Sequence, residues 1–229
     1  MECKVIIGLP VYNGEQTIRR SIEAILSQTF KNFILIISDN ASTDSTQIIC
    51  EEYEKKDKRI KYIRQNKNLS ALKNFKLLLN MANSKYFAWI SDDDFWDKSF
   101  LEKNIKILDS KEDVIGSIGQ TSFIGDFWEV NKNEKFIRKI YKKIRRHFLS
   151  LKCYSTKGAK YEDRIKICFK SSRYPVCIFS LFHTDVLKKT ANHTMPPWDA
   201  ITIIKILKYG NIHIFDETLV FRSQGGASS

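Results

Sequence analysis

The chain has 229 residues, of which 43% are apolar and 28% charged, and its formal net charge at pH 7 is +12. This length suits one domain with a substantial core, and no apolar run approaches the roughly 18 residues that would predict a membrane-spanning helix. The first residues lack the basic and apolar regions of a signal peptide, and five scattered cysteines indicate reduced thiols instead of a disulfide framework or a zinc site. We therefore expect a cytoplasmic protein.

Short apolar runs and amphipathic segments alternate up to residue 120. The apolar runs predict strands over residues 3–10, 33–38, 59–65, 86–91 and 113–119. The segments between them have apolar side chains at helical spacing and predict helices over residues 15–29, 41–56, 70–82 and 98–110. This order favours right-handed βαβ crossovers and an α/β fold, with a mainly parallel sheet flanked by helices.

The pattern becomes irregular after residue 120. A helix is expected over residues 198–210, where Gly210 closes it. Two short strand-like runs follow, over residues 211–215 and 218–222. There is no internal repeat and no long linker, so the chain is expected to form a single domain.

A strongly basic segment covers residues 132–148, with eight Lys or Arg residues and one Glu. Phe136, Ile140, Ile144 and Phe148 recur at every fourth position, which predicts an amphipathic basic helix. Such a helix suits the anionic surface of a membrane or the pyrophosphate group of a ligand; the alternative is a packed helix with one solvated face. Because its basic face lacks aromatic residues that could stack on bases, we do not expect a nucleic-acid partner.

Three adjacent aspartates, Asp92, Asp93 and Asp94, follow the apolar run of residues 86–91. Parallel sheets bind ligands beyond the carboxyl ends of their strands. Adjacent carboxylates at that edge suit Mg²⁺ or Mn²⁺, which are often shared with substrate phosphates. The alternative is a solvated acidic turn ahead of the next helix, since aspartate is favourable near a helix N-terminus.

Other polar residues follow the neighbouring strands. Asp39 ends the run of residues 33–38, and it is either a hydrogen-bond acceptor for a base or ribose or the start of an Asx-turn. The segment PVYNGE over residues 10–15 offers backbone N–H groups, the aromatic face of Tyr12 and Gly14 for close approach. Neither a dinucleotide-binding fingerprint nor a P-loop motif occurs in the sequence.

Four motifs in a fixed order resemble the family 2 glycosyltransferases, which have the GT-A fold. They are VIIGLPVYNGEQTIRRSIEAILSQTF, LIISDNASTDST, NKNLSALKNF and FAWISDDDFWDKSFLEK. The resemblance covers residues 3–110 and continues weakly through RYPVCIFSLFHTDVLKK, PPWDAITI and LVFRSQGG. It implies a nucleotide-sugar donor with UDP favoured, a divalent metal (Mn²⁺ or Mg²⁺), and inversion at the anomeric carbon by direct displacement.

The resemblance also implies which residues hold the nucleotide. Residues that follow the first two strands would contact the base and ribose: Pro10, Val11, Tyr12, Glu15, Asp39 and Asn40. Lys73 stands where the family usually has an arginine and would approach the nucleotide. A lysine keeps the charge of that arginine but lacks its planar fork of donors. The alternative for Lys73 is an exposed lysine on a helix.

The metal ligands implied by the resemblance lie among the three aspartates. The family pattern is commonly D-x-D-D, and Ser91 occupies the first of those places. Asp93 is the expected metal ligand, Asp92 would meet the ribose or the metal, and Asp94 is the third choice.

The acceptor side depends on the start of the late helix. The family usually has an acidic residue there, and Asp199 would take the proton of the acceptor hydroxyl as a general base. The alternative is an ordinary aspartate at a helix N-terminus. Trp198 would stack on a sugar face or fill the core, and Arg222 would reach the phosphates of the nucleotide-sugar.

We therefore expect one GT-A domain over residues 1–229, with a nucleotide-sugar-binding half (1–120) and an irregular, helical acceptor-binding half (121–229). Its expected activity is the metal-dependent, inverting transfer of a sugar to a hydroxyl of a glycan or lipid-linked saccharide. One alternative is a sugar-phosphate nucleotidyltransferase. The other is a degenerate module that only binds nucleotide-sugars.

Overall fold

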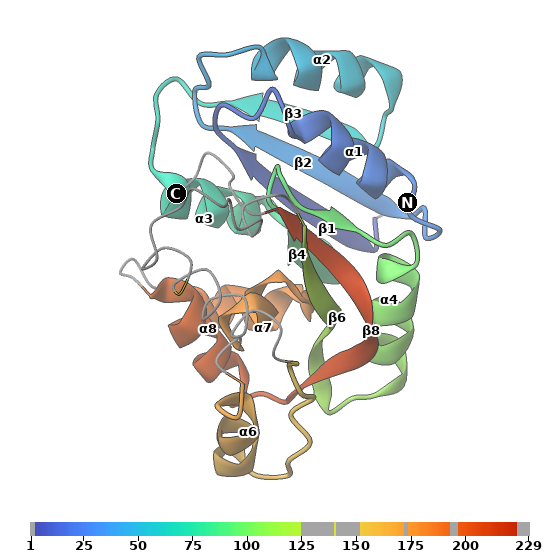
Figure 1. The fold of residues 1–229 in the computed structure, drawn as a ribbon, viewed down its shortest axis with the longest axis vertical. Coiled ribbons are helices and arrows are strands. Elements are labelled where there is room, and N and C mark those ends of the chain that lie inside the picture. The colour runs from blue at the N-terminus through green and yellow to red at the C-terminus, as the bar shows by residue number, and fades with distance from the viewer. Residues whose placement is uncertain (1–2, 125–139, 141–151, 172–173, 193–196, 224–229) are drawn as a thin grey trace.

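The computed structural model describes residues 3–124, 140, 152–171, 174–192 and 197–223 (Figure 1). The basic segment of residues 132–148 lies outside these described residues apart from Ile140, so the helix expected there stays a prediction. No helix among the described residues has the length and apolar character that crossing a membrane requires.

The first half of the chain forms a parallel sheet. Its strands are β1 (Val5–Val11), β2 (Phe33–Asp39), β3 (Ile60–Arg64) and β4 (Tyr86–Trp89). They lie in the order β3-β2-β1-β4, and every neighbouring pair is parallel. Strands β1 and β4 are buried along their whole length, which explains why they occur in the sequence as continuous apolar runs.

Helices connect these strands and lead into the second half. They are α1 (Ile18–Leu26), α2 (Thr46–Lys56), α3 (Ala71–Met81) and α4 (Phe100–Ser110). Figure 1 shows α1 and α3 on opposite sides of the strands. The chain adds strands from β1 to β3 and then returns to β4, so right-handed crossovers require this change of side. The expected α/β alternation is confirmed.

The strands after β4 extend the same sheet, mainly with antiparallel pairs. Its strands are β5 (Phe95–Trp96), β6 (Val114–Ile124), β7 (Leu181–His183) and β8 (Asn211–Ser223). The full order is β3-β2-β1-β4-β7-β6-β8-β5. Strand β7 is antiparallel to both β4 and β6, whereas β6 and β8 are parallel. The whole sheet is therefore mixed. Strands β1 to β4 form one part of it in which every neighbouring pair is parallel.

The expectation of two separate strands near the C-terminus is wrong. Residues 211–215 and 218–222 belong to one continuous strand, β8. Asp216 and Glu217, which lie between the two runs, are exposed, and the register between β6 and β8 shifts at this point. The polar residues form a bulge that pairing with β6 bridges, so they do not end the strand.

The remaining helices of the second half are short. They are α6 (Tyr161–Cys168), the 3-10 helix η2 (Tyr174–Phe179), α7 (Thr184–Thr190) and α8 (Trp198–Ile206). Helix α8 ends at Ile206, short of the expected residue 210. Gly210 lies beyond it, where a Cβ atom would be 2.7 Å from the carbonyl oxygen of Asp113. Gly210 therefore serves the close approach of the chain to the start of β6.

The contact between β6 and β7 leads to a stability prediction. Gly116 lies opposite Phe182, and a Cβ atom at Gly116 would be 2.4 Å from Phe182 Cε1. Phe182 is fully buried, so its ring has no free space to move into. We expect Gly116→Ala to lower the free energy of unfolding by about 1–3 kcal/mol, measured by chemical denaturation.

The matched control on the same strand is Ser117→Ala. The Ser117 hydroxyl is buried and has no hydrogen-bond partner in the part of the chain that the structure describes. Its removal should change the free energy of unfolding by less than about 0.5 kcal/mol or raise it. Equal losses of unfolding free energy in the two variants would show that the contact with Phe182 is not the reason why residue 116 must be glycine.

Candidate active site

A pocket lies at the carboxyl ends of β1, β2 and β4. Its volume is about 210 Å³. The loops after these strands and helix α3 line it with Pro10, Val11, Tyr12, Asn40, Asn68, Ala71, Asn74, Phe75, Ser91, Asp92 and Asp93. Several residues predicted from the sequence therefore meet at the sheet edge where α/β folds bind ligands.

The loop after β1 is held by the segment that leads into α2. Asn13 has a positive φ of 53°, and its side-chain oxygen accepts a hydrogen bond from Thr43 N at 2.8 Å. Gly14 N donates to Thr46 Oγ1 at 2.9 Å. A Cβ atom at Gly14 would lie 2.6 Å from Asp92 Oδ2, so only glycine permits this close approach to the aspartates.

Tyr12 and Glu15, both predicted to bind the nucleotide, have different surroundings. Tyr12 lines the pocket, and its side chain is 43% exposed. Glu15 is not among the lining residues. Its carboxylate accepts a hydrogen bond from Ser45 N at 3.0 Å, while Glu15 N donates to Asp44 Oδ2 at 3.0 Å. This reciprocal pair ties the loop to the start of α2.

Asp39 ends β2, and its side chain is fully buried. Its Oδ1 accepts hydrogen bonds from the backbone N–H and the hydroxyl of Ser42, at 2.8 and 2.6 Å. Its Oδ2 accepts from Tyr62 Oη at 2.7 Å and from Arg64 Nη1 at 2.6 Å. Two donors on each oxygen fill the lone-pair sites of the carboxylate. Asp39 thus anchors the loop beside the pocket and does not itself line it.

Asparagines from three elements form one wall of the pocket. Asn40 Nδ2 donates to Asn68 Oδ1 at 3.0 Å, and Asn40 Oδ1 accepts from Leu69 N at 2.8 Å. Asn74 is buried on α3, and its Nδ2 donates to Ser38 O at 2.8 Å. Asn68 lies in the segment QNKNLS (65–70), which follows the third expected strand and is a candidate by its position alone, whereas the sequence does not single out Asn74. Both occur in the motif NKNLSALKNF, but uncharged amides in a loop and a helix give no further signal.

The turn that carries the three aspartates is held by α1. Ser21 Oγ donates to the carbonyl oxygens of Asp92 and Asp94, at 2.7 and 2.6 Å. Arg20 Nη2 donates to the carbonyl oxygen of Asp93 at 2.7 Å. Because these bonds use backbone oxygens, the three carboxylates stay available for other partners.

The three carboxylates have different partners. Asp94 is buried and accepts hydrogen bonds from Arg222 Nε at 2.9 Å and from Ser223 N at 3.2 Å. Asp92 accepts from Thr17 Oγ1 at 3.3 Å. Asp93 lines the pocket, and its carboxylate forms no hydrogen bond or ion pair with the described residues. Asp92 and Asp93 therefore face the pocket, and Asp94 is neutralised beside it.

Burial disfavours the charged form of all three groups. It raises the pKa of Asp92 to about 6, and the charge of Asp93 adds to this effect. It raises the pKa of Asp94 to about 7, although the charge of Arg222 opposes the shift. Burial also raises the pKa of Asp93, with Arg222 and Arg20 opposing. A cation in the pocket would favour the charged forms again.

The pair Asp92 and Asp93 fits a divalent cation that is shared with a substrate. Within the described residues, no group of three or more His, Cys, Asp or Glu side chains is placed to hold a metal ion. Mg²⁺ is commonly held by one or two carboxylates together with substrate phosphates and water. Two adjacent carboxylates that form no ion pair with the described residues match that set of ligands, whereas Asp94 is paired with Arg222.

Arg222 and Lys73, both predicted to approach the nucleotide-sugar, differ in position. Arg222 reaches the aspartates from the end of β8, and its guanidinium carbon lies 4.4 Å from the centre of the Phe179 ring. Lys73 is exposed on α3, does not line the pocket and has no ion pair with the described residues. The structure therefore brings Arg222, but not Lys73, to the carboxylates.

Trp198 and Asp199 open helix α8. The Trp198 ring is half-buried and packs against Phe75 and Trp89, with ring centroids 5.6 and 5.8 Å apart. Asp199 Oδ1 accepts a hydrogen bond from Ala200 N at 2.8 Å. Neither residue lines the pocket, but Phe75 does, so the start of α8 packs directly behind the pocket wall.

Asp92 leads to a prediction of pH-dependent stability. Its pKa is raised on folding, so the folded state binds more protons than the unfolded state between about pH 4 and pH 6. The wild type therefore loses stability as the pH rises through this window, and Asp92→Asn loses less, because only Asp93 and Asp94 still titrate with a raised pKa there. In urea denaturation without divalent cations, Asp92→Asn should gain on the order of 1–2 kcal/mol over wild type between about pH 4.5 and pH 7.5.

Asp109→Asn is the control with the opposite shift. Burial of Asp109 is outweighed by hydrogen bonds from Lys4, Lys85 and Tyr86, which hold its pKa below the ordinary value. The stabilisation from Asp109 is lost only below about pH 4. Asp109→Asn should therefore be less stable than the wild type by nearly the same amount at about pH 4.5 and at about pH 7.5. The interpretation fails if the stability difference between Asp92→Asn and the wild type is also the same at these two pH values.

Comparison with known proteins identifies the family. The model for Glycosyl transferase family 2 matches residues 6–189. Glycosyltransferase GlyA of Streptococcus pneumoniae is 31% identical over 133 residues, which are 57% of this chain and 18% of that protein. An uncharacterized glycosyltransferase of Methanocaldococcus jannaschii is 27% identical over 200 residues, 81% of this chain and 68% of the relative. The chain thus spans from about a fifth to about two thirds of the length of these relatives.

Solved structures share the fold at low sequence identity. S. aureus TarS 1-349 in complex with UDP-GlcNAc has a TM-score of 0.71 at 16% identity, over 96% of this chain and 58% of that one. Mannosyltransferase PcManGT from Pyrobaculum calidifontis, in complex with GDP-Man and Mn²⁺, has a TM-score of 0.61 at 13% identity, over 98% of this chain and 57% of that one. Because the family match covers most of the chain and the shared fold nearly all of it, this chain belongs to glycosyl transferase family 2 and has the GT-A fold.

Proposed function

We propose that this chain transfers a sugar, with inversion, from a nucleotide-sugar to a hydroxyl of a glycan or lipid-linked saccharide. The observation that carries the proposal is the pair Asp92 and Asp93. These are two adjacent carboxylates that form no ion pair with the described residues, in a pocket at the carboxyl edge of the parallel strands. Such a pair suits a diphosphate and its cation. Membership of family 2 favours this activity over a sugar-phosphate nucleotidyltransferase.

The nucleoside would bind against the loop after β1 and the asparagine wall. Tyr12 offers an exposed ring for stacking, and Asn40 and Asn68 offer amide groups at the pocket surface. For Asp39 to bond directly to the base or ribose, one of the four hydrogen bonds that its carboxylate accepts would have to break. If none breaks, Asp39 acts by positioning Asn40. We favour UDP, since TarS has been solved with UDP and UDP-GlcNAc, although PcManGT has been solved with GDP-Man.

Asp93, with Asp92 beside it, would hold Mn²⁺ or Mg²⁺ together with the diphosphate. When bound, the cation neutralises charge that develops on the leaving diphosphate. Arg222 adds a fixed positive charge next to the aspartates, and its ion pair with Asp94 sets the position of the guanidinium. The aspartates and the arginine thus provide the electrostatic stabilisation that such a departure needs.

Asp199 is the proposed general base. It would take the proton of the acceptor hydroxyl while the oxygen bonds to the anomeric carbon and the bond to the diphosphate breaks. Its support is its place at the start of α8, next to Trp198, which packs on Phe75 of the pocket wall. We assign acceptor binding to residues 121–229. Docking of residues 132–148 on an anionic membrane and a cytoplasmic location both stay predictions.

Thermal unfolding with and without Mn²⁺ tests the binding of the nucleotide-sugar. UDP at about 100 times its Kd adds roughly 2.7 kcal/mol, which raises the Tm by several degrees. We expect a shift with UDP that depends on Mn²⁺ and disappears in Asp93→Ala, each protein being compared with its own ligand-free Tm. Asp163→Ala, which removes an exposed aspartate on α6, should keep the full shift. A shift that survives in Asp93→Ala would remove Asp93 from the metal site.

Asp199→Asn tests the chemical step. Loss of a general base typically lowers the rate by about 10²–10⁴-fold, so transfer to saccharide acceptors should fall in this range while UDP binding stays unchanged. Asp185→Asn is the matched control, because Asp185 is also an aspartate in the first turn of a helix, α7, and is exposed. Unchanged transfer in Asp199→Asn would exclude Asp199 as the base. Binding without any transfer by wild type would favour the degenerate binding module.

A further inference from the structure

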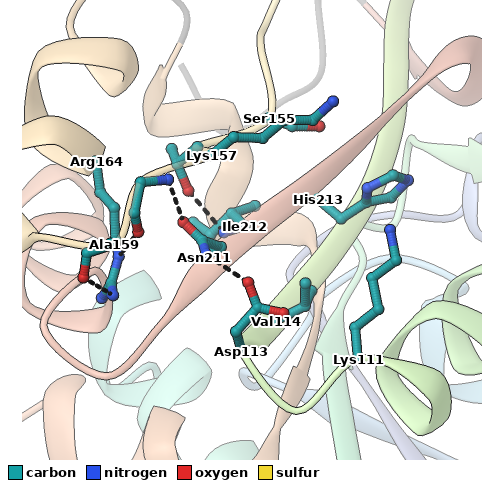
Figure 2. A pocket seen from close by; sticks show the side chains of 12 residues that line it. Lys111, Asp113, Val114, Ser155, Lys157, Ala159, Arg164, Asn211, Ile212 and His213 are labelled. Carbon is teal, nitrogen blue, oxygen red and sulfur yellow. Dashed lines mark hydrogen bonds between the residues drawn. The ribbon is translucent and has the colours of Figure 1, made fainter.

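A second and larger pocket lies at the opposite end of the sheet from the aspartates (Figure 2). Its volume is about 690 Å³, against about 210 Å³ for the first pocket. It forms where β6 and β8 begin, between these strands, residues 155–159 and Arg164 of α6. The volume is in the range of pockets that bind small molecules.

The walls of this pocket are fixed by hydrogen bonds between distant parts of the chain (Figure 2). Gly158 N donates to Asn211 Oδ1 at 3.1 Å, and Asn211 Nδ2 donates to Asp113 Oδ2 at 2.8 Å. Arg164 donates to the carbonyl oxygens of Gly158 and Leu207, at 2.7 and 2.9 Å. The pocket is thus formed without any ligand. Arg164 is bonded to backbone oxygens, and the Asp113 carboxylate, bonded to the neutral Asn211 amide, keeps its negative charge at the edge of the pocket.

Three basic side chains of the pocket form no hydrogen bond or ion pair with the residues that the structure describes. Lys111 precedes β6, Lys157 lies in the 155–159 segment, and His213 is on β8. The two lysines form no ion pair with the described residues. Burial lowers the pKa of His213, and the charges of Lys111 and Lys157 lower it further, with Asp216 opposing. All three side chains line the same pocket, and Figure 2 shows the Lys111 side chain ending beside the His213 ring.

We infer that this pocket binds the phosphate group of a phosphorylated ligand through Lys111, Lys157 and His213. Two ammonium groups that line one preformed pocket favour an anion there. Lysine is a point-charge donor to phosphate, and a phosphate ester offers up to two negative charges and three terminal oxygens. The pocket is larger than a phosphate, so the rest of the ligand would lie along residues 155–159. A phosphorylated saccharide is the source we favour; the headgroup of a phospholipid is the other.

This site is separate from the candidate active site. His213 lies near the start of β8 and Arg222 near its end. At about 3.3 Å per residue, the strand places these two residues on the order of 30 Å apart. The inference therefore does not depend on the proposed transferase activity, and either can fail without the other.

NMR titration of the full 229-residue chain with inorganic phosphate tests the site. We expect a saturable shift of the His213 ring signals, assigned by their absence in His213→Gln. The double variant Lys111→Ala/Lys157→Ala should weaken binding by at least about tenfold. Lys58→Ala/Lys61→Ala is the charge-matched control, because both lysines are exposed at the start of β3, on the opposite edge of the sheet from β6 and β8, and it should bind as the wild type does. The thermal midpoint of each variant shows whether it is folded.

Two results would overturn the inference. One is the absence of any His213 shift at millimolar phosphate. The other is equal weakening in the two double variants, which would mean that phosphate responds only to net charge. The source of the phosphate is then tested with glucose 1-phosphate and with dioctanoyl phosphatidic acid. Tighter binding of the sugar phosphate than of inorganic phosphate supports the favoured source, whereas tighter binding of the lipid alone overturns that choice.

Discussion

The ion pair between Arg222 and Asp94 joins the last strand of the chain to the turn that carries the aspartates. Arg222 Nε lies 2.9 Å from the Asp94 carboxylate, and next to it Phe221 stacks on Phe95 with ring centroids 4.9 Å apart. A buried carboxylate that loses its partner destabilises a fold by about 3–5 kcal/mol. The candidate active site therefore depends on a contact between residues that are 128 positions apart in the sequence.

This ion pair also separates the roles of three adjacent carboxylates. Asp94 is neutralised inside the protein, which leaves Asp92 and Asp93 on the side of the pocket. Helix α1 holds the backbone of the same turn through Ser21 and Arg20, so the two free carboxylates keep their place without a ligand. A cation and a diphosphate would thus meet a site that is already organised, which is the arrangement that stabilises charge most effectively.

Strand β8 connects two sites of opposite charge. Its end brings Arg222 to a pocket lined by Asp92 and Asp93, and its start brings His213 to a pocket lined by Lys111, Lys157 and Arg164 beside a single carboxylate, Asp113. The first suits a cation that is shared with a diphosphate, and the second suits an anion. The net charge of +12 does not reveal this division, because it sums over both ends of the sheet.

The sequence by itself determined the alternation of strands and helices and the place of the aspartates after β4. Both depend on local periodicity and on the order of motifs, which a linear sequence records directly. Only the tertiary structure decided that Asp39 is saturated by Ser42, Tyr62 and Arg64, and that Asn68 and Asn74 line the pocket. The sequence offers no means of choosing among the many possible partners of a buried carboxylate.

The same limit applies to the C-terminal half. Asp216 and Glu217 interrupt an apolar run, which is a local signal for the end of a strand, but pairing with β6 carries β8 past them. The pocket at the start of β8 combines Lys111, Lys157 and His213, which no spacing rule connects. Periodicity fixes the elements because it acts over a few residues. The sites depend on contacts between residues that are up to 128 positions apart, which only folding brings together.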